Sequence, residues 1–212
     1  MNNLEFIYKR HSVRTFTNEV VKPEDLAAII QAATYAPSGK NLQNWHFVVV
    51  KNQEKIEKIV KLVEEKNAEL AAYLTDEAKQ KAFRAALKYN TAFRGAPMLI
   101  LVYAGPYPTL ADDLLEFSTL DKAQALEYTK PNPGIQNIGA AIQNLQLAAA
   151  NMGYGTCWMT GATYADKEIS EYLGFAKPGF YLAAMSTLGV PARTDIKNPP
   201  RKAVESVMTI IE

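Results

Sequence analysis

The chain has 212 residues, of which 48% are hydrophobic and 21% are charged, and its formal net charge is +1. These values match globular averages, so they exclude a disordered chain and give no electrostatic reason to expect a nucleic-acid or membrane partner. A single cysteine, Cys157, excludes a disulfide framework within one chain. The N-terminus lacks a signal-peptide pattern and no apolar run approaches about 20 residues, so we expect a cytoplasmic protein.

Hydrophobic periodicity predicts the elements of the first half of the chain. A first helix is expected over 23–36, because a proline suits its first turn and apolar residues follow at helical spacing. Aromatic and β-branched residues predict a strand over 45–51. The elements expected next are an amphipathic helix from about residue 53, a helix over 76–92 and a buried strand over 97–104.

The second half contains one ambiguous segment and a clearer series of elements. Four prolines punctuate 105–133, which predicts a loop or lid with short helical pieces; we call it the lid segment. The elements expected after it are a buried helix over 134–152, a strand over 155–160, a helix over 166–173 and a strand over 180–188. The apolar tail at 204–211 reads as extended, and it must pair with a sheet because one strand cannot satisfy its own backbone groups.

The order of these elements predicts an α+β fold. Helices and strands follow one another along residues 1–212 without a linker, a repeat or a low-complexity tract. Such a pattern indicates one domain in which helices cover a central sheet.

The first candidate site is the segment from Arg10 to Phe16, which reads Arg-His-Ser-Val-Arg-Thr-Phe. Alternate residues of an extended segment share one face, so Arg10, Ser12 and Arg14 could converge on one ligand. The planar donor fork of arginine suits phosphate oxygens, and serine adds a neutral donor. From spacing alone, a phosphate clamp and a solvated charged loop are equally good interpretations.

The second candidate site is the polar segment between the first helix and the first strand. Ser38, Asn41 and Gln43 offer neutral donors and acceptors, which can pair with the edge of a heterocycle. The alternative is an ordinary turn at a helix C-terminus.

Taken in this order, the two segments resemble the signatures of the nitroreductase family of flavin enzymes. Residues 10–16 match the family's opening signature throughout, and Asn44 replaces the usual proline of the second signature. The residues that match the second signature are Pro37, Ser38, Asn41, Gln43 and Trp45. Further blocks that resemble the family lie at 96–97, 144–149, 153–158, 188–191 and 200–202. The resemblance covers nearly the whole chain.

The resemblance implies a mostly antiparallel sheet and a homodimer with FMN at the subunit interface. It also implies that the C-terminal strand is exchanged between the two subunits. We expect the helix over 134–152 to lie near the two-fold axis.

The resemblance further implies which residues hold the cofactor phosphate and the ribityl chain. Arg10, Ser12 and Arg14 would do so, with His11 nearby. Arg201, from the C-terminal block, would add a third guanidinium group.

A second group of residues is implied for the isoalloxazine ring. Thr160 and Gly161 match the place where family backbone donors reach the ring near N5, and further polar contacts fall near 89–93 without a fixed register. The residues that would approach the ring from the second subunit are Pro37, Ser38, Gly39 and Asn41.

The resemblance implies an FMN-dependent oxidoreductase with a ping-pong mechanism. NADH or NADPH would reduce the flavin and leave, and an electron-poor acceptor such as a nitroaromatic or a quinone would take its place. No side chain needs to act as an acid or base, and two histidines without acidic partners at ligand spacing predict no metal site. Aromatic residues that could stack on planar substrates are Tyr103, Tyr107, Phe117 and Tyr128.

Two alternatives stay open at this point. One is an enzyme of the same fold that breaks down flavin or reductively dehalogenates aromatic substrates. The other is a non-enzymatic protein that binds FMN. The sequence does not choose between NADH and NADPH, because it has no Rossmann glycine signature.

Overall fold

A four-stranded antiparallel sheet forms the centre of the computed structural model, which describes residues 4–195 and 198–212. The strand order is β1–β2–β4–β3, and every pair of neighbours is antiparallel. The strands are β1 (Trp45–Val50), β2 (Met98–Ala104), β3 (Gly155–Met159) and β4 (Tyr181–Gly189). The α+β class predicted from the sequence is confirmed.

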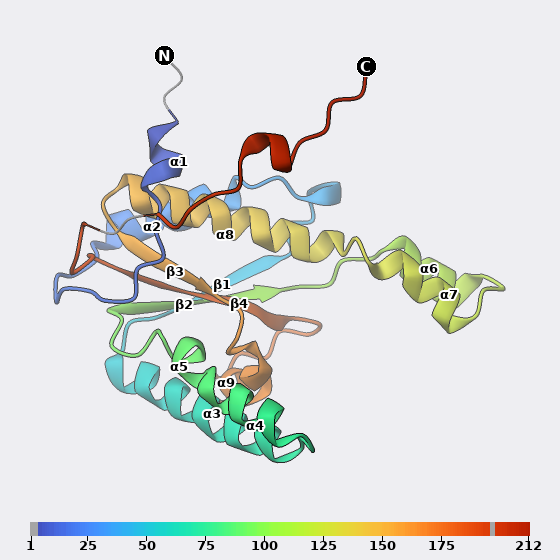
Figure 1. Cartoon of the computed structure of the whole chain (residues 1–212), viewed down its shortest axis with the longest axis horizontal. Helices are drawn as coiled ribbons and strands as arrows, with labels where there is room; N and C mark the ends of the chain where they lie inside the picture. Colours follow the sequence, from blue (N-terminus) through green and yellow to red (C-terminus); the bar gives the residue numbers. More distant parts are fainter. Residues whose placement is uncertain (1–3, 196–197) are drawn as a thin grey trace.

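Helices cover both faces of this sheet (Figure 1). The helices α2 (Pro23–Thr34) and α8 (Pro133–Asn151) lie side by side on one face. The other face carries α3 (Gln53–Ala72), α4 (Glu77–Ala85), α5 (Leu87–Asn90) and α9 (Asp166–Leu173). Because both faces are covered, every residue of β2 is buried, which explains its uninterrupted apolar sequence.

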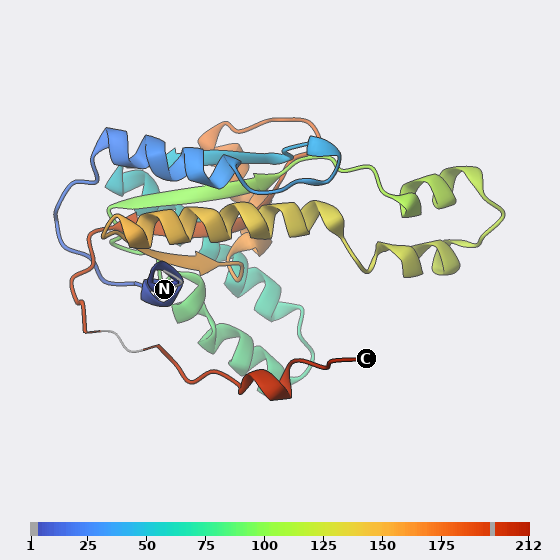
Figure 2. The ribbon, with the colours of Figure 1, turned by 90° about the horizontal axis from the view of Figure 1, so that it is seen from above.

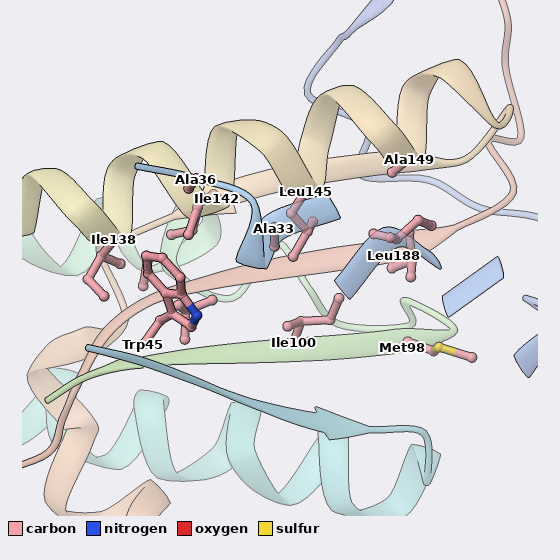
Figure 3. Close-up of a cluster of buried hydrophobic side chains, with 14 of the residues drawn as sticks. Ala33, Ala36, Trp45, Met98, Ile100, Ile138, Ile142, Leu145, Ala149 and Leu188 are labelled. Carbon is pink, nitrogen blue, oxygen red and sulfur yellow. The ribbon is translucent and has the colours of Figure 1, made fainter. Parts of the chain in front are cut away.

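Two hydrophobic cores result, one on each side of the sheet. Ile100 of β2 belongs to the core beneath α8, where it lies near Ile142 and Leu145 (Figure 3). Its neighbour Leu101 points the opposite way and belongs to the core against α3. This alternation is the two-residue period of a strand, and it divides one apolar segment between two layers.

Local sequence signals define both ends of α8. Pro133 occupies the first turn, and the side chain of Asn132 accepts a hydrogen bond from the backbone N–H of Ile135 (3.2 Å). The helix ends at Asn151, and Gly153 follows with a φ of +84°. A positive φ costs glycine least, so the chain turns here into β3.

The predicted helix over 76–92 is interrupted. The chain bends at Ala86, between α4 and α5, and then places Phe93 fully inside the core below the sheet. Alanine-rich sequence carries no signal for such a bend, because alanine favours a continuous helix. A short helix α1 (Glu5–Lys9), which buries none of its residues, was not predicted either.

The lid segment contains three short helical pieces, as its sequence predicts. They are α6 (Leu110–Phe117), α7 (Lys122–Leu126) and the 3-10 turn η2 (Glu127–Thr129). Both α-helices begin with a capping box, formed by Thr109 with Asp112 and by Asp121 with Gln124. Figure 2 shows this pair of helices projecting away from the body of the molecule.

The extended strand expected over 204–211 is not formed within a single chain. Residues 204–206 form a single 3-10 turn, η4 (Val204–Ser206), and residues 207–212 join no strand of the sheet. Figure 2 shows the tail to one side of α8 and apart from the four strands. Its apolar side chains are exposed, with 72% of Ile210 and 92% of Ile211 accessible. Pairing with a second chain stays a prediction.

Candidate functional site

The segment that carries Arg10, Ser12 and Arg14 lies along the outer edge of β3. Ser12 forms a parallel bridge with Thr156, and the backbone N–H of Val13 donates to Thr156 O (2.8 Å). The side chain of Val13 is buried. The segment is therefore extended, which is the conformation that the alternation argument requires.

A cleft of about 550 Å³ collects three of the five residues predicted to surround the phosphate. Arg10 and Ser12 reach it from the β3 edge, and Arg201 reaches it from the C-terminal segment. The remaining residues that line it are Ile7, Tyr8, Gln143, Gln146, Trp158 and Asn198. None of these described residues is acidic, and none of the ion pairs among the described residues uses Arg10 or Arg201. The cleft is thus a cationic site suited to an anion.

The other two predicted phosphate residues lie differently. Arg14 is exposed, and its Nη1 atom donates to the carbonyl oxygen of Ser12 (3.4 Å), so it stays beside the segment. His11 faces the opposite way, into a second cavity that it shares with Tyr154 and Arg193. The structure does not bring His11 to the cleft. Side chains of an extended segment point alternately to two faces, so His11 points to the face opposite that of Arg10 and Ser12.

The thiol of Cys157 lies behind the cleft, near the guanidinium groups of Arg10 and Arg14. Burial raises the pKa of its thiol, while the nearby guanidinium groups of Arg14 and Arg10 and a hydrogen bond from Ser12 act in the opposite direction. The thiol is buried and free, so it is an inert core residue rather than a nucleophile.

The 37–43 loop lies at the other end of α8. It includes the 3-10 turn η1 (Gly39–Asn41). Three residues of the loop that are not glycine have a positive φ: Lys40 (56°), Asn41 (51°) and Gln43 (45°). The backbone N–H of Gln43 donates to Ser38 Oγ (3.0 Å), which closes the loop. Positive φ at non-glycine residues costs about 1 kcal/mol or more each, and such strain concentrates at ligand-binding loops.

The loop does not reach the cleft within one chain. Its Gly39 N–H donates to Asn137 Oδ1 (3.3 Å), whereas the nearest cleft residue of α8 is Gln143. These two residues of α8 are separated by about 9 Å along the helix, at 1.5 Å per residue. Pro37, Ser38, Gly39 and Asn41 therefore form a separate group, as they would if they served the site of a second subunit.

Thr160 and Gly161 follow the end of β3 and are exposed. The carbonyl oxygen of Thr160 accepts hydrogen bonds from the backbone N–H (3.2 Å) and the hydroxyl (2.8 Å) of Thr163, which fixes the turn. A Cβ atom at position 161 would collide with Asn90 Oδ1, so the Asn90 amide packs directly against the backbone of Gly161. The backbone of residue 161 and the amide of Asn90 thus form one polar corner.

The chain matches the model of the nitroreductase family over residues 7–189. It belongs to this family. A BluB-like flavoprotein from Clostridium difficile 630 is 40% identical, with a TM-score of 0.90 and 100% of each chain covered. A nitroreductase with bound FMN from Desulfitobacterium hafniense DCB-2 is 27% identical, with a TM-score of 0.71 and the same coverage. These similarities confirm the family and the nitroreductase-like fold predicted from the sequence.

A relative from Archaeoglobus fulgidus carries a name that refers to a reductant. It is called "Putative NADH dehydrogenase/NAD(P)H nitroreductase" and is 26% identical over 192 residues, which cover 89% of this chain and 84% of the relative.

Trp158 could be either a flavin contact or a core residue from its sequence, whereas the two glutamines of this nitroreductase-family cleft were not predicted. Trp158 is 39% exposed although it lies on a strand, and it lines the cleft. Gln143 and Gln146 lie three residues apart on α8, and the Nε2 atom of Gln146 donates to Thr156 Oγ1 (3.3 Å). A polar pair at that spacing on a buried helix is the signal that could have identified them.

Among the four aromatic residues predicted to stack on substrates, Tyr103 is misplaced. It is fully buried in β2, its hydroxyl is hydrogen-bonded to Ser170 Oγ (2.9 Å), and its ring packs on Phe175. Phe117 and Tyr128 are exposed on the lid segment, and Tyr107 is half-buried at its base.

Proposed function

We propose that this chain is an FMN-dependent oxidoreductase that passes electrons from NADH or NADPH to an electron-poor acceptor such as a nitroaromatic or a quinone. The observation that carries the proposal is the cleft in which Arg10, Ser12 and Arg201 converge without an acidic neighbour among its described lining residues. Membership of the nitroreductase family, a relative with bound FMN and a relative named for NAD(P)H support it.

The residues of the cleft fit the phosphate end of FMN. Two guanidinium groups can form charge-assisted hydrogen bonds with a phosphate dianion, and Ser12 adds a neutral donor. A phosphate group also needs the absence of nearby carboxylates, and the described lining meets this condition. Arg14, beside Ser12, would complete a three-arginine site.

The ring end would lie by the corner of Thr160, Gly161 and Asn90. There the Asn90 amide fills the space beside Gly161, so the backbone of residue 161 and the Asn90 side chain would face the ring together. Pro37, Ser38, Gly39 and Asn41 of a second subunit would cover the ring, which makes a homodimer part of this proposal. FMN supplies the hydride chemistry when bound, and the residues position it and limit the access of water.

Ping-pong kinetics follow from a shared substrate position. NAD(P)H and the acceptor would occupy the same open face in turn, beneath a lid formed by residues 105–133. No side chain is assigned as an acid or base.

Residues 1–212 would act as one FMN-binding domain. Of the described helices, none is both long and apolar enough to cross a bilayer; the cytoplasmic location expected from the sequence stays a prediction.

The visible spectrum of the purified protein, with added FMN, tests the proposal. We expect a flavin band near about 450 nm that NADH or NADPH bleaches and that a quinone or nitroaromatic restores. No bound flavin at all would overturn the proposal. Oxygen consumption with loss of flavin, or halide release from a halogenated phenol, would replace it with the alternative enzyme of the same fold, and binding without turnover would replace it with the non-enzymatic FMN-binding protein.

A further inference from the structure

Both ends of the lid segment are hydrogen-bonded to one buried side chain, that of Asn44. Its Nδ2 atom donates to Gly105 O (3.3 Å), where the segment begins, and to Gly134 O (3.3 Å), just past its end. The backbone N–H of Gly105 also donates to the carbonyl oxygen of Asn44 (2.6 Å). Only 5% of Asn44 is exposed, so water does not compete for these bonds.

The acceptor side of the same amide leads to the 37–43 loop. Asn137 Nδ2 donates to Asn44 Oδ1 (2.9 Å), and Asn137 Oδ1 accepts from the backbone N–H of Gly39 (3.3 Å). Asn137 is 7% exposed. The relay therefore runs from Gly39 through two buried amides to both ends of the lid segment, and it uses both N–H donors of Asn44.

Packing links the same two parts. Tyr107, near the start of the lid segment, has its hydroxyl where a Cβ atom of residue 39 would lie, and its own Cβ atom would be 2.8 Å from a Cβ atom at position 134. The absence of a side chain at both positions lets Tyr107 pack against the backbone there. Tyr107 therefore contacts both the 37–43 loop at Gly39 and the start of α8 at Gly134.

The base is also where the position of the lid segment is decided. The helices α6 and α7 contact each other and η2, and they project from the body (Figure 2). One more bond near the base, from Lys40 Nζ to Pro108 O (3.3 Å), is exposed and contributes less. The buried bonds of Asn44 are therefore the main polar connection between the lid segment and the sheet among the described residues.

We propose that Asn44 is a positioning residue that couples the base of the lid segment to the 37–43 loop, so that the two move together. The proposal rests on the proposed function, in which that loop covers the flavin ring and the lid segment covers the acceptor. The coupling would make closure over the acceptor dependent on correct placement of the loop. Proline, the usual residue of the family signature at this position, has no side-chain amide to make these bonds.

Hydrogen exchange of the full-length protein tests the coupling, with Asn44→Ala and Asn137→Ala as the two variants. In each, we expect exchange of backbone amides in both 106–133 and 39–43 to accelerate by about tenfold, the effect of one or two lost buried hydrogen bonds. Asn144→Ala is the matched control, because it removes an amide bond from the same helix to Ala32 O (3.3 Å), away from both segments. We expect less than about twofold change there.

Steady-state kinetics give a second readout. A lid segment that closes less often lowers the fraction of binding-competent enzyme, so the KM for the acceptor should rise by about fivefold at nearly unchanged kcat.

Two results would overturn the coupling: acceleration in only one of the two segments, or acceleration no larger than in Asn144→Ala. If Asn44→Ala does not fold, Asn137→Ala decides alone. If the protein binds no FMN, the proposed function fails, whereas the exchange result still decides whether the two segments are coupled.

Discussion

The lid segment and the C-terminal tail both leave the body of the molecule, yet only the lid segment is folded. Both expose apolar side chains, such as Phe117 (77%) on the lid segment and Ile211 (92%) on the tail. The lid segment consists of capped helices that bury Ala111 and Ala125 between them. The tail, residues 198–212, has one 3-10 turn and is exposed throughout.

The difference lies in where each segment finds its hydrogen-bond partners. The lid segment satisfies its helix ends locally, through two capping boxes, and both of its ends are held by Asn44. In the tail, Asn198 Nδ2 donates to Tyr8 O (2.7 Å), and the other side-chain bonds are local. A segment with its own caps folds beside the body, whereas a segment without them needs a partner.

The largest expected effect comes from removing residues 204–212, which keeps Arg201. If the tail pairs with a second subunit, burial of two of its apolar side chains contributes about 3 kcal/mol or more, so the dimer should dissociate about 100-fold more readily. Light scattering over a concentration series measures this. Tyr73→Ser, which removes an exposed side chain (73%) from the body, is the control. An unchanged dimer in the truncated chain would show that the tail pairs with nothing.

The tail also brings Arg201 to the cleft, so a single substitution there should act on the cofactor alone. We expect Arg10→Ala and Arg201→Ala each to weaken FMN binding by about 10- to 100-fold, because each loses a charge-assisted hydrogen bond. Fluorescence titration with FMN measures the affinity, and unfolding without FMN should not change. Arg84→Ala, on the opposite face of the sheet, is the control. Equal affinity in all three would return the Arg10 segment to a charged loop.

The comparison also explains what could be predicted from the sequence. The helices α2 and α8 and the strands β1 and β2 were predicted because their apolar residues follow the period of one element. The alternation of an extended segment predicted that Arg10 and Ser12 could share a ligand, whereas Arg201 was added through the family resemblance, since nearly two hundred residues separate it from Arg10. No local pattern brings such distant residues together.

What could not be predicted depends on contacts between elements. Asn44 looked like a simple departure from a signature, and its role appears only when Gly105, Gly134 and Asn137 surround it. Tyr103 has an aromatic ring of the kind that stacks on planar substrates, but its position in β2 buries it. The break at Ala86 separates α4 from α5 within an alanine-rich stretch, whose helix propensity gives no signal for it.

A smaller effect is expected from weakening a cap of the lid segment. Thr109→Ala removes the side chain that accepts from Asp112 N–H (3.4 Å), and loss of a cap costs about 1 kcal/mol. Exchange of the amides in α6 should accelerate by about fivefold. Global unfolding should not change, because the helix projects from the body. Thr75→Ala, in an exposed turn, is the control; equal exchange in both variants would show that tertiary contacts, not caps, hold α6 together.

The smallest effect concerns the body beneath the lid segment, where His46 packs against Phe175 and Phe180 (centroids 5.1 and 6.3 Å away). Burial, helped by the charge of Lys177, lowers the pKa of His46 below its usual 6.5. The unfolded chain therefore takes up a proton first, so stability falls as the pH drops below about 6.5 and levels off beneath the folded pKa. Urea unfolding between about pH 5 and 7.5 measures this decrease.

His46→Phe should abolish that decrease, and Lys177→Met should make it shallower because it removes the second cause. Phe180 also packs on Gly105, so protonation of His46 should loosen the lid segment at its base and leave the tail unaffected. Hydrogen exchange of the backbone amides, measured at both ends of that pH range and corrected for the intrinsic pH dependence of exchange, distinguishes the lid segment from the tail. A pH dependence that is equal in the tail and the lid segment would contradict this link, because only the lid segment is connected to the ring beside His46.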